Sequence, residues 1–163
     1  MRCLVLALAV VVAFTSVSCV KKEKMGQVPF SSLWLTDFET AKQVARKQNR
    51  PILMLLTGSD WCPACMALEA EALSKPEFLA YAKEHLVLLL VDFPAYKQVP
   101  ADAAKINAAL AERYDPTQLF PILLLLDAEG KELFRQEGYE PESGPKPLIG
   151  QLDAQLKKAA GKP

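Results

Sequence analysis

The sequence predicts an α/β domain in which helices flank both faces of a central mixed sheet. Short continuous apolar runs, typical of strands buried on both faces, alternate with amphipathic segments of helical period. The chain has 163 residues, of which 51% are hydrophobic and 23% charged, so it can form one packed core. The expected order of elements is β-α-β-α-β-α-β-β-α.

The first expected elements precede the only Cys-X-X-Cys motif of the chain. Residues 33–35 are apolar and are expected to form a short edge strand. Thr36 or Asp37 can then cap a helix that ends near Gln48 and carries its apolar residues on one face. Residues 52–57 form a continuous apolar run, which predicts a strand buried on both faces.

The middle of the chain predicts a helix in two pieces, followed by a strand. A turn at residues 58–61 leads into a helix over residues 62–75. Pro76 begins the second helical piece, which ends at His85, because proline is favoured in the first turn of a helix. Residues 86–91 are apolar and predict a second buried strand.

The last third of the chain predicts a helix, a hairpin and a terminal helix. Residues 101–114 carry apolar side chains at a spacing of four, as one face of a helix requires. Residues 122–126 predict a third buried strand, and residues 131–137 return beside it as an antiparallel partner after a short turn. Residues 148–160 predict the terminal helix.

The N-terminus is typical of a secretory signal peptide. One basic residue, Arg2, precedes an uncharged and almost wholly apolar stretch at residues 4–14, and small residues follow. A run this short would only poorly span a hydrocarbon core of ~30 Å as a helix. A buried core helix is disfavoured because charged residues follow at once. The predicted organisation is a signal peptide at residues 1–18, a tether at 19–30 and one domain at 31–163.

The end of the predicted signal peptide resembles a bacterial lipobox. Its sequence is Ser-Val-Ser-Cys, and the cysteine, Cys19, would become the lipidated first residue of the mature chain. Ser16 stands where leucine is usual, and ordinary signal peptidase would cut the same bond and leave a free thiol. Lipidation is favoured because a free thiol is a liability in an oxidising compartment. The expected location is periplasmic or otherwise extracytoplasmic, with membrane attachment through lipid at Cys19.

Charge and cysteine counts limit the classes of function. Nineteen Lys and Arg residues balance nineteen Asp and Glu residues, which removes the usual argument for a nucleic-acid partner. A single histidine excludes a His-rich metal site, whereas four cysteines would allow zinc or two disulfides. Processing would remove Cys3 and lipidation would occupy Cys19, which leaves Cys62 and Cys65 as a pair. We therefore expect no metal site.

The remaining cysteines form the motif Cys-Pro-Ala-Cys. Between a strand and a helix, such a motif places both sulfurs in the first helical turn, where the helix dipole favours a thiolate at Cys62. The pair can perform thiol–disulfide exchange: Cys62 attacks a partner disulfide and Cys65 resolves the mixed disulfide. Pro63 suits an early helix position. A structural disulfide, zinc ligation with two further ligands, and two unpaired cysteines are the alternatives.

Two stretches of the sequence resemble the thioredoxin superfamily. The first is Ser59 to Cys65, which follows an apolar strand. The second is Leu119 to Asp127, which is similar to the cis-proline strand of that family. The resemblance covers roughly residues 36–160 and implies a thioredoxin-like fold. It also implies that electrons come from a partner redox protein rather than from a bound cofactor.

The resemblance further implies roles for individual residues. Cys62 resembles the nucleophile and Cys65 resembles the resolving thiol of the family. Pro121 resembles the cis-proline that faces the disulfide. The residues implied in substrate binding are Trp61, Pro63, Phe120 and Pro121. We expect an apolar partner surface around them, which would bind an extended polypeptide through backbone hydrogen bonds beside Pro121.

The chain departs from the family at Leu56. Thioredoxins carry a buried acid there, six residues before the first cysteine of the motif, so the usual proton relay is missing. Asp60 and Glu69 are candidates to replace it, although each is also compatible with a solvated surface residue. Residues 51–74 contain acids but no Lys or Arg, and nearby anions disfavour a thiolate. This pattern predicts a reducing or middling redox potential rather than a strong oxidant.

These features predict an extracytoplasmic thiol–disulfide oxidoreductase. Its partners would be exported proteins with thiols or disulfides and an upstream redox protein. Two other functions stay open. One is a partner-specific reductant in cytochrome c maturation, which shares the chemistry. The other is a lipid-anchored binding module that uses the fold as a scaffold; the missing acid favours it, and the retained motif weighs against it.

Overall fold

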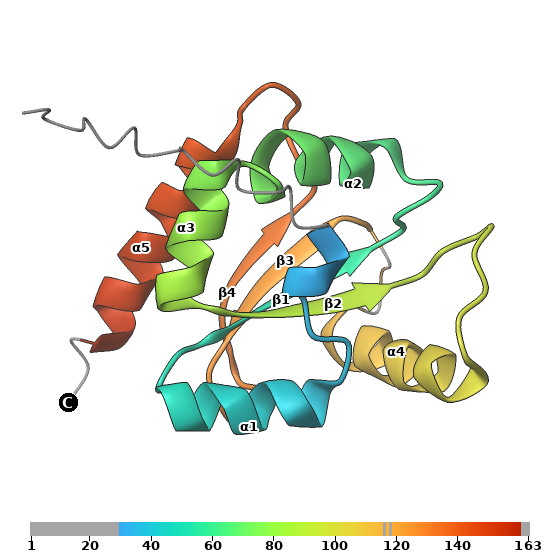
Figure 1. Cartoon of the computed structure of the whole chain (residues 1–163), viewed down its shortest axis with the longest axis horizontal. Coiled ribbons are helices and arrows are strands. Elements are labelled where there is room, and N and C mark those ends of the chain that lie inside the picture. Colours follow the sequence, from blue (N-terminus) through green and yellow to red (C-terminus); the bar gives the residue numbers. More distant parts are fainter. Residues whose placement is uncertain (1–29, 116, 118, 161–163) are drawn as a thin grey trace, which may run out of the picture.

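The computed structural model describes residues 30–115, 117 and 119–160 (Figure 1). The signal peptide predicted at residues 1–18, nearly all of the predicted tether and the lipidation candidate Cys19 lie outside these described residues. Within them, no helix combines the length and the apolar character that crossing a membrane requires.

A four-stranded sheet forms the centre of the fold, with the strand order β2-β1-β3-β4. Its strands are β1 (Ile52–Thr57), β2 (Val87–Asp92), β3 (Ile122–Leu126) and β4 (Glu132–Glu137). β1 and β2 are parallel, whereas β3 is antiparallel to both β1 and β4. The prediction of a mixed sheet with an antiparallel hairpin at one edge is confirmed.

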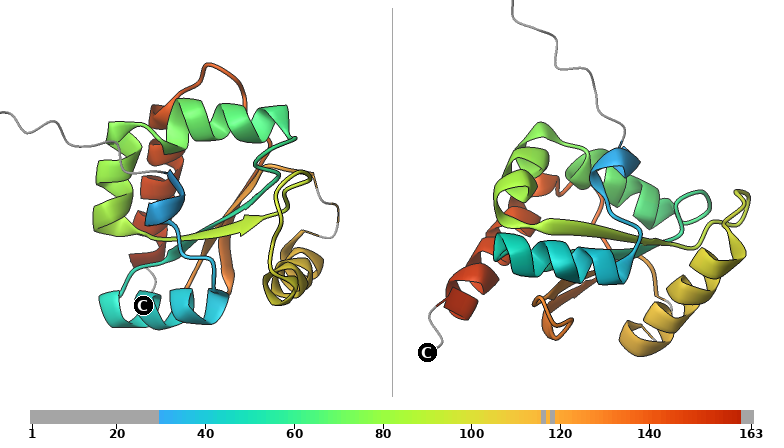
Figure 2. Two further views of the ribbon diagram at one scale, coloured as in Figure 1. Left: turned by 45° about the vertical axis from the view of Figure 1, so that its right-hand side comes forward. Right: turned by 60° about the horizontal axis from the view of Figure 1, so that its bottom comes forward.

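Helices cover both faces of this sheet (Figure 1). They are α1 (Phe38–Gln48), α2 (Pro63–Leu68) with its π-helical continuation η2 (Glu69–Leu73), α3 (Pro76–His85), α4 (Ala101–Tyr114) and α5 (Pro145–Ala160). Helices α1 and α4 pack on one face, and α2, η2, α3 and α5 pack on the other. The two layers are visible on either side of the sheet in Figure 2. The predicted α/β fold is confirmed.

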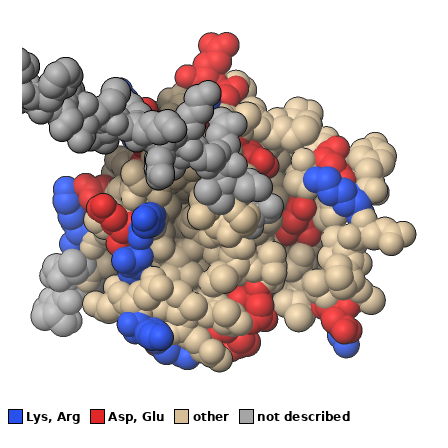
Figure 3. Space-filling view, viewed as in Figure 1, with Lys and Arg blue, Asp and Glu red and all other residues tan. Residues whose placement is uncertain are grey.

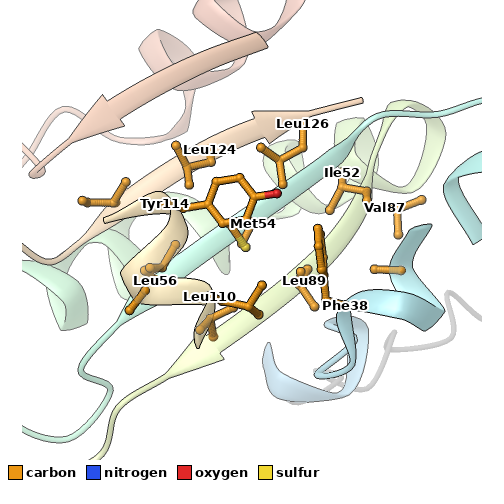
Figure 4. Close-up of a cluster of buried hydrophobic side chains, with 14 of the residues drawn as sticks. Phe38, Ile52, Met54, Leu56, Val87, Leu89, Leu110, Tyr114, Leu124 and Leu126 are labelled. Atoms are coloured by element: carbon orange, nitrogen blue, oxygen red, sulfur yellow. The ribbon is translucent and has the colours of Figure 1, made fainter. Parts of the chain in front are cut away.

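The two central strands show why their apolar runs are continuous. All residues of β1 and β3 are buried, because helices cover the sheet from both sides. Successive side chains alternate between the two layers: Met54 packs with α1 and α4, and Leu55 packs with the helices opposite. Figure 4 shows the first cluster, in which Met54 and Leu124 of the sheet lie with Tyr114 of α4.

The edge strand expected at residues 33–35 is wrong. Phe30–Leu33 form a 3-10 turn, η1, and only Leu35 pairs with the sheet, through a single parallel bridge to β2. The rings of Phe30 and Trp34 lie 5.1 Å apart, and side chains four positions apart meet in this way when the backbone turns helically. The aromatic contact therefore favours a turn over an extended strand.

The boundaries of two helices also differ from the expectation. The helix expected over residues 62–75 is α-helical only to Leu68 and then widens into η2. Helix α5 begins at Pro145, ahead of the expected start at residue 148. Proline is tolerated at the first helical position because its missing N–H would have no intrahelical partner there.

Asp37, rather than Thr36, caps helix α1. Its carboxylate accepts a hydrogen bond of 2.7 Å from the Thr40 N–H. Hydrogen bonding to the side chain of Thr40, and then to its N–H, lowers the pKa of Asp37, which is the sign expected for an acid at the positive end of a helix. The same helix ends at Asn49, whose left-handed backbone (φ 51°) places its N–H on the last carbonyl oxygens.

Candidate active site

The two motif cysteines lie at the carboxyl end of β1, in the turn that leads into α2. Cys62 is the N-cap residue of α2, Cys65 lies in its first turn, and a disulfide joins them with their Cα atoms 5.2 Å apart. Pro63 occupies the first helical position. Only 6% of Cys62 and 3% of Cys65 is exposed. A partner therefore reaches this pair only through a small opening.

The local geometry favours a thiolate at Cys62 once the disulfide is reduced. The Cys65 N–H donates a hydrogen bond of 3.2 Å to Cys62 Sγ, which also lies at the positive end of the helix dipole. Both a hydrogen bond to the sulfur and a positive potential stabilise the charged form of a thiol. Cys65 lies deeper in the helix. The arrangement therefore suits Cys62 as the attacking thiol and Cys65 as the resolving thiol.

The segment before β3 meets the disulfide from the other side. The peptide bond between Phe120 and Pro121 is cis, and its carbonyl oxygen, on Phe120, lies 3.8 Å from Cys62 Sγ. A disulfide sulfur carries no hydrogen, so in this oxidised state the approach is a contact rather than a hydrogen bond. The fold thus brings Phe120 and Pro121 to Cys62 across 58 positions of sequence.

Three aromatic side chains form one wall of the site. The ring centroids of Trp61 and Phe120 lie 6.1 Å apart, and Phe120 stacks on Phe93 at 5.1 Å. Trp61 keeps 45% of its surface exposed. Gly58 lies under its indole ring, and a Cβ added there would clash with the ring. The wall therefore combines two predicted residues, Trp61 and Phe120, with Phe93, which was not predicted.

Two aspartates that hold this wall in place were not predicted in that role. Asp60 accepts hydrogen bonds from the three consecutive N–H groups of residues 95–97, at 2.7, 3.0 and 3.1 Å. Asp92 accepts hydrogen bonds from the N–H and the hydroxyl of Ser59, at 2.9 and 2.6 Å. The indole N–H of Trp61 donates to the carbonyl of the residue after Asp92, at 2.7 Å. The turn before α2 is therefore tied to the loop between β2 and α4.

The acid missing from β1 has no substitute on that strand. Leu56 is fully buried in the apolar cluster against α1 and α4. Asp60 is a poor candidate for the proton relay because three N–H donors occupy its carboxylate. Desolvation would raise the pKa of Asp60, but these hydrogen bonds and the nearby Lys97 together hold it below its usual range.

Glu69 is the better placed of the two candidate acids. It lies one helical turn beyond Cys65, at the start of η2. Burial raises the pKa of Glu69, Lys97 opposes this effect, and Asp92 adds to it. A carboxyl group of raised pKa near the resolving thiol can exchange a proton at a pH closer to neutrality. Across the described ranges, no group of three or more His, Cys, Asp or Glu side chains is arranged to hold a metal ion.

Lys97 changes the charge pattern that the sequence around the motif suggests. Residues 51–74 contain no Lys or Arg, but the loop between β2 and α4 brings Lys97 into electrostatic contact with Asp60 and Glu69. The acids beside the motif are therefore partly compensated. On the face shown in Figure 3, basic and acidic side chains are interspersed. The redox potential inferred from local charge stays a prediction.

Known proteins share this fold. A family model described as a thioredoxin-like domain matches residues 38–152. The disulfide bond reductase DsbH of Chlamydia pneumoniae is 32% identical over 142 residues, which make up 87% of this chain and 84% of DsbH. A solved structure of a DsbH oxidoreductase aligns with a TM-score of 0.70 and 32% identity, covering 76% of this chain and 83% of that one.

A second relative matches over a shorter part of its length. The thioredoxin-related protein DsbJ of Chlamydia pneumoniae is 28% identical over 114 residues, which make up 70% of this chain but 32% of DsbJ. The fold and the disulfide at the start of α2 define a thiol–disulfide oxidoreductase whose redox pair is Cys62 and Cys65. The chain belongs to the thioredoxin-like family. The family expected from the two sequence stretches is confirmed.

Proposed function

We propose that this protein reduces disulfides of exported proteins from a position outside the cytoplasm. The observation that carries the proposal is the Cys62–Cys65 disulfide at the start of α2, beside the exposed ring of Trp61. The reductase direction is supported by the similarity to a disulfide bond reductase and by the carboxylates of Asp60 and Glu69 near the motif. The dipeptide between the cysteines, Pro-Ala, carries no positive charge that would further stabilise a thiolate.

The proposed reaction transfers two electrons from the reduced pair to a partner. The Cys62 thiolate attacks one sulfur of the partner disulfide; that bond breaks, a mixed disulfide forms, and the other partner sulfur leaves as a thiolate. Cys65 then loses its proton and attacks Cys62 Sγ, which releases the second partner thiolate and forms the Cys62–Cys65 disulfide. Both partner thiolates take up protons. A reduced dithiol protein must return two electrons to the pair.

The location is part of the proposal. It rests on the apolar signal-like segment at residues 1–18 and on the lipobox-like sequence that ends at Cys19. A lipid at Cys19 would attach the mature chain to a membrane, and residues 20–30 would tether the domain. Growth of expressing cells with labelled palmitate tests this point. The wild type is expected to incorporate the label and Cys19→Ser is not. An unlabelled wild type, or equal labelling of both proteins, would contradict lipidation at Cys19.

Trapping of the mixed disulfide tests the proposed chemistry. In a Cys65→Ser variant the mixed disulfide at Cys62 cannot be resolved, so covalent complexes with exported proteins are expected to accumulate in cells. The double variant that also carries Cys62→Ser is the matched control. If the single variant forms no more complexes than the double variant, and insulin reduction survives the loss of Cys62, the proposed function fails. The identity of the trapped proteins tells a general reductase from one dedicated to cytochrome c maturation.

A binding module is the second candidate function, because Leu56 fills the position of the acid that would serve catalysis. A scaffold has no reason to stabilise a thiolate at Cys62. The rate of Cys62 alkylation in the reduced protein, followed against pH, separates the two functions. A midpoint below the ordinary cysteine value of ~8.5 is expected for the oxidoreductase. A midpoint at or above that value favours the binding module.

A further inference from the structure

Exposed apolar side chains gather on the segments that meet at the disulfide. The large hydrophobic residues exposed in the described part of the chain are Leu33, Trp61, Met66, Tyr96, Ile106 and Leu119. Four of these six lie on the turn and first part of α2, on the loop between β2 and α4, or next to Phe120. These segments are joined by the ring contact of Trp61 with Phe120 and by the hydrogen bond from the Tyr96 N–H to Asp60, so their exposed apolar side chains offer a surface to another protein.

Tyr96 is the most exposed of the six, with 83% of its surface accessible. The backbone that carries it is nevertheless held firmly, because Asp60 binds the N–H of Tyr96 and those of both neighbours. Figure 2 shows the turn before α2 and the loop before α4 at the same end of the sheet. A tyrosine on a fixed loop gives a large contact area at low entropic cost on binding.

The loop that carries Tyr96 also borders a hollow. Its lining comes from the end of β2, the loop and the first half of α4: Asp92, Phe93, Pro94, Lys97, Val99, Ala104 and Asn107. The hollow has a volume of about 310 Å³, near the lower end for small-molecule sites. Its floor is fixed by a hydrogen bond of 2.9 Å from the Asn107 side chain to the Asp92 carbonyl. Phe93 belongs both to this lining and to the aromatic wall, so the hollow adjoins the wall.

The occupant of this surface follows from access to Cys62. Since Cys62 is only 6% exposed and its Sγ lies 3.8 Å from the Phe120 carbonyl oxygen, a partner sulfur that reaches it must pass close to Phe120, which belongs to both the aromatic wall and the cis-proline segment. The loop of residues 95–97 is bound to Asp60, two residues before Cys62, so it lies within reach of a polypeptide that surrounds the partner sulfur. A small disulfide reagent does not extend that far. The occupant is therefore a segment of the substrate polypeptide next to its disulfide, in a locally unfolded form that exposes apolar side chains.

We propose that the loop carrying Tyr96 is a recognition element for the polypeptide that flanks the substrate disulfide, and that Asp60 is the positioning residue that holds it. This proposal rests on the proposed function, because it assumes a protein disulfide as substrate. It assigns a role to residues 95–97, which the cysteine motif and the cis-proline do not include. Tyr96 contributes binding rather than chemistry, so its loss affects protein substrates selectively.

The test compares two disulfides and two variants of the reduced protein. Second-order rate constants for oxidation are measured with insulin and with hydroxyethyl disulfide, and their ratio is the readout. Tyr96→Ala is expected to lower this ratio about tenfold, as loss of an aromatic anchor does in protein interfaces. Ile106→Ala, which also truncates an exposed apolar side chain, is the matched control and is expected to keep the wild-type ratio.

Each outcome of this experiment decides one point. An unchanged ratio in Tyr96→Ala, or an equal fall in Ile106→Ala, overturns the recognition role of the loop. If insulin and hydroxyethyl disulfide both fail to oxidise the reduced wild type, the proposed function fails instead. Misfolding is not a concern for Tyr96→Ala, because the side chain is almost fully exposed, and thermal unfolding of both variants checks this directly.

Discussion

At each end of the sheet an aspartate holds a loop, but the two aspartates differ in how far along the sequence their hydrogen-bond donors lie. At the end with the disulfide, Asp60 binds N–H groups that lie 35 to 37 positions further along the chain. At the opposite end, Asp127 binds the N–H groups of Glu129 and Lys131 within its own turn. The first carboxylate joins two segments, whereas the second shapes one.

This difference has a functional consequence. The turn at Asp127 is also fixed by Gly130, whose φ of 86° suits glycine and whose carbonyl accepts a hydrogen bond of 2.6 Å from Tyr114. Several local interactions therefore hold the turn at Asp127 in place. At the disulfide end, the position of the loop beside Trp61 depends on contacts between distant segments. Loss of one carboxylate should affect substrate binding at one end and stability alone at the other.

The largest expected effect is that of Asp60→Ala. Without the carboxylate, three N–H groups lose their acceptor and the loop with Tyr96 is released. The ratio of oxidation rates with insulin and hydroxyethyl disulfide is expected to fall about tenfold, as for Tyr96→Ala. The double variant should show no further fall, because both changes remove the same contact. Additive losses would show that Asp60 acts in another way.

The matched change at the other end, Asp127→Ala, is expected to be smaller and different in kind. Two N–H groups of an exposed turn would then bond to water, at a cost of about 1 kcal/mol of unfolding free energy. Urea denaturation measures this loss. The insulin to hydroxyethyl disulfide ratio should equal that of the wild type. A fall comparable to that of Asp60→Ala would remove the distinction between the two ends.

The smallest effect concerns Glu69, whose pKa burial raises above the ordinary value of 4.5. The folded protein then holds this proton more tightly than the unfolded chain does, so stability falls as pH rises from about the unfolded value through the folded one. Glu69→Gln removes the titration. Urea midpoints of the oxidised protein, measured between pH 4 and pH 8, should decline less in the variant. An identical pH dependence in both proteins would show that Glu69 is not perturbed.

Much of the fold could be predicted because buried strands have a recognisable pattern of apolar residues in the sequence. β1 and β3 are covered on both faces, so their apolar runs are unbroken and their limits are visible. The turn at Asp127 could be predicted for a similar reason, since its partners are neighbours in sequence. The edge strand predicted at residues 33–35 was wrong because an apolar triplet is also compatible with a turn. The deciding contact is that of Trp34 with Phe30.

The site could be predicted only in part. Cys62 and Cys65 were recognisable because the motif is local and its position after a strand is informative. The role of Asp60 in holding the loop that carries Tyr96 was not recognisable, because the hydrogen bond that joins the two residues links distant segments and lies in a loop without periodic pattern. Asp92 left a weak signal: it ends a strand parallel to β1, and the carboxyl ends of parallel strands meet at one edge of a sheet.

The central claim is that the Cys62–Cys65 pair works as a reductant of protein disulfides. Its most direct test is the reduction potential of the pair, obtained by equilibration in glutathione and dithiothreitol redox series with the free thiols quantified. A reducing or middling value, at or below about −180 mV, is predicted from the uncharged Pro-Ala dipeptide and the neighbouring acids. A value near −120 mV, typical of a strong oxidant, would contradict the account.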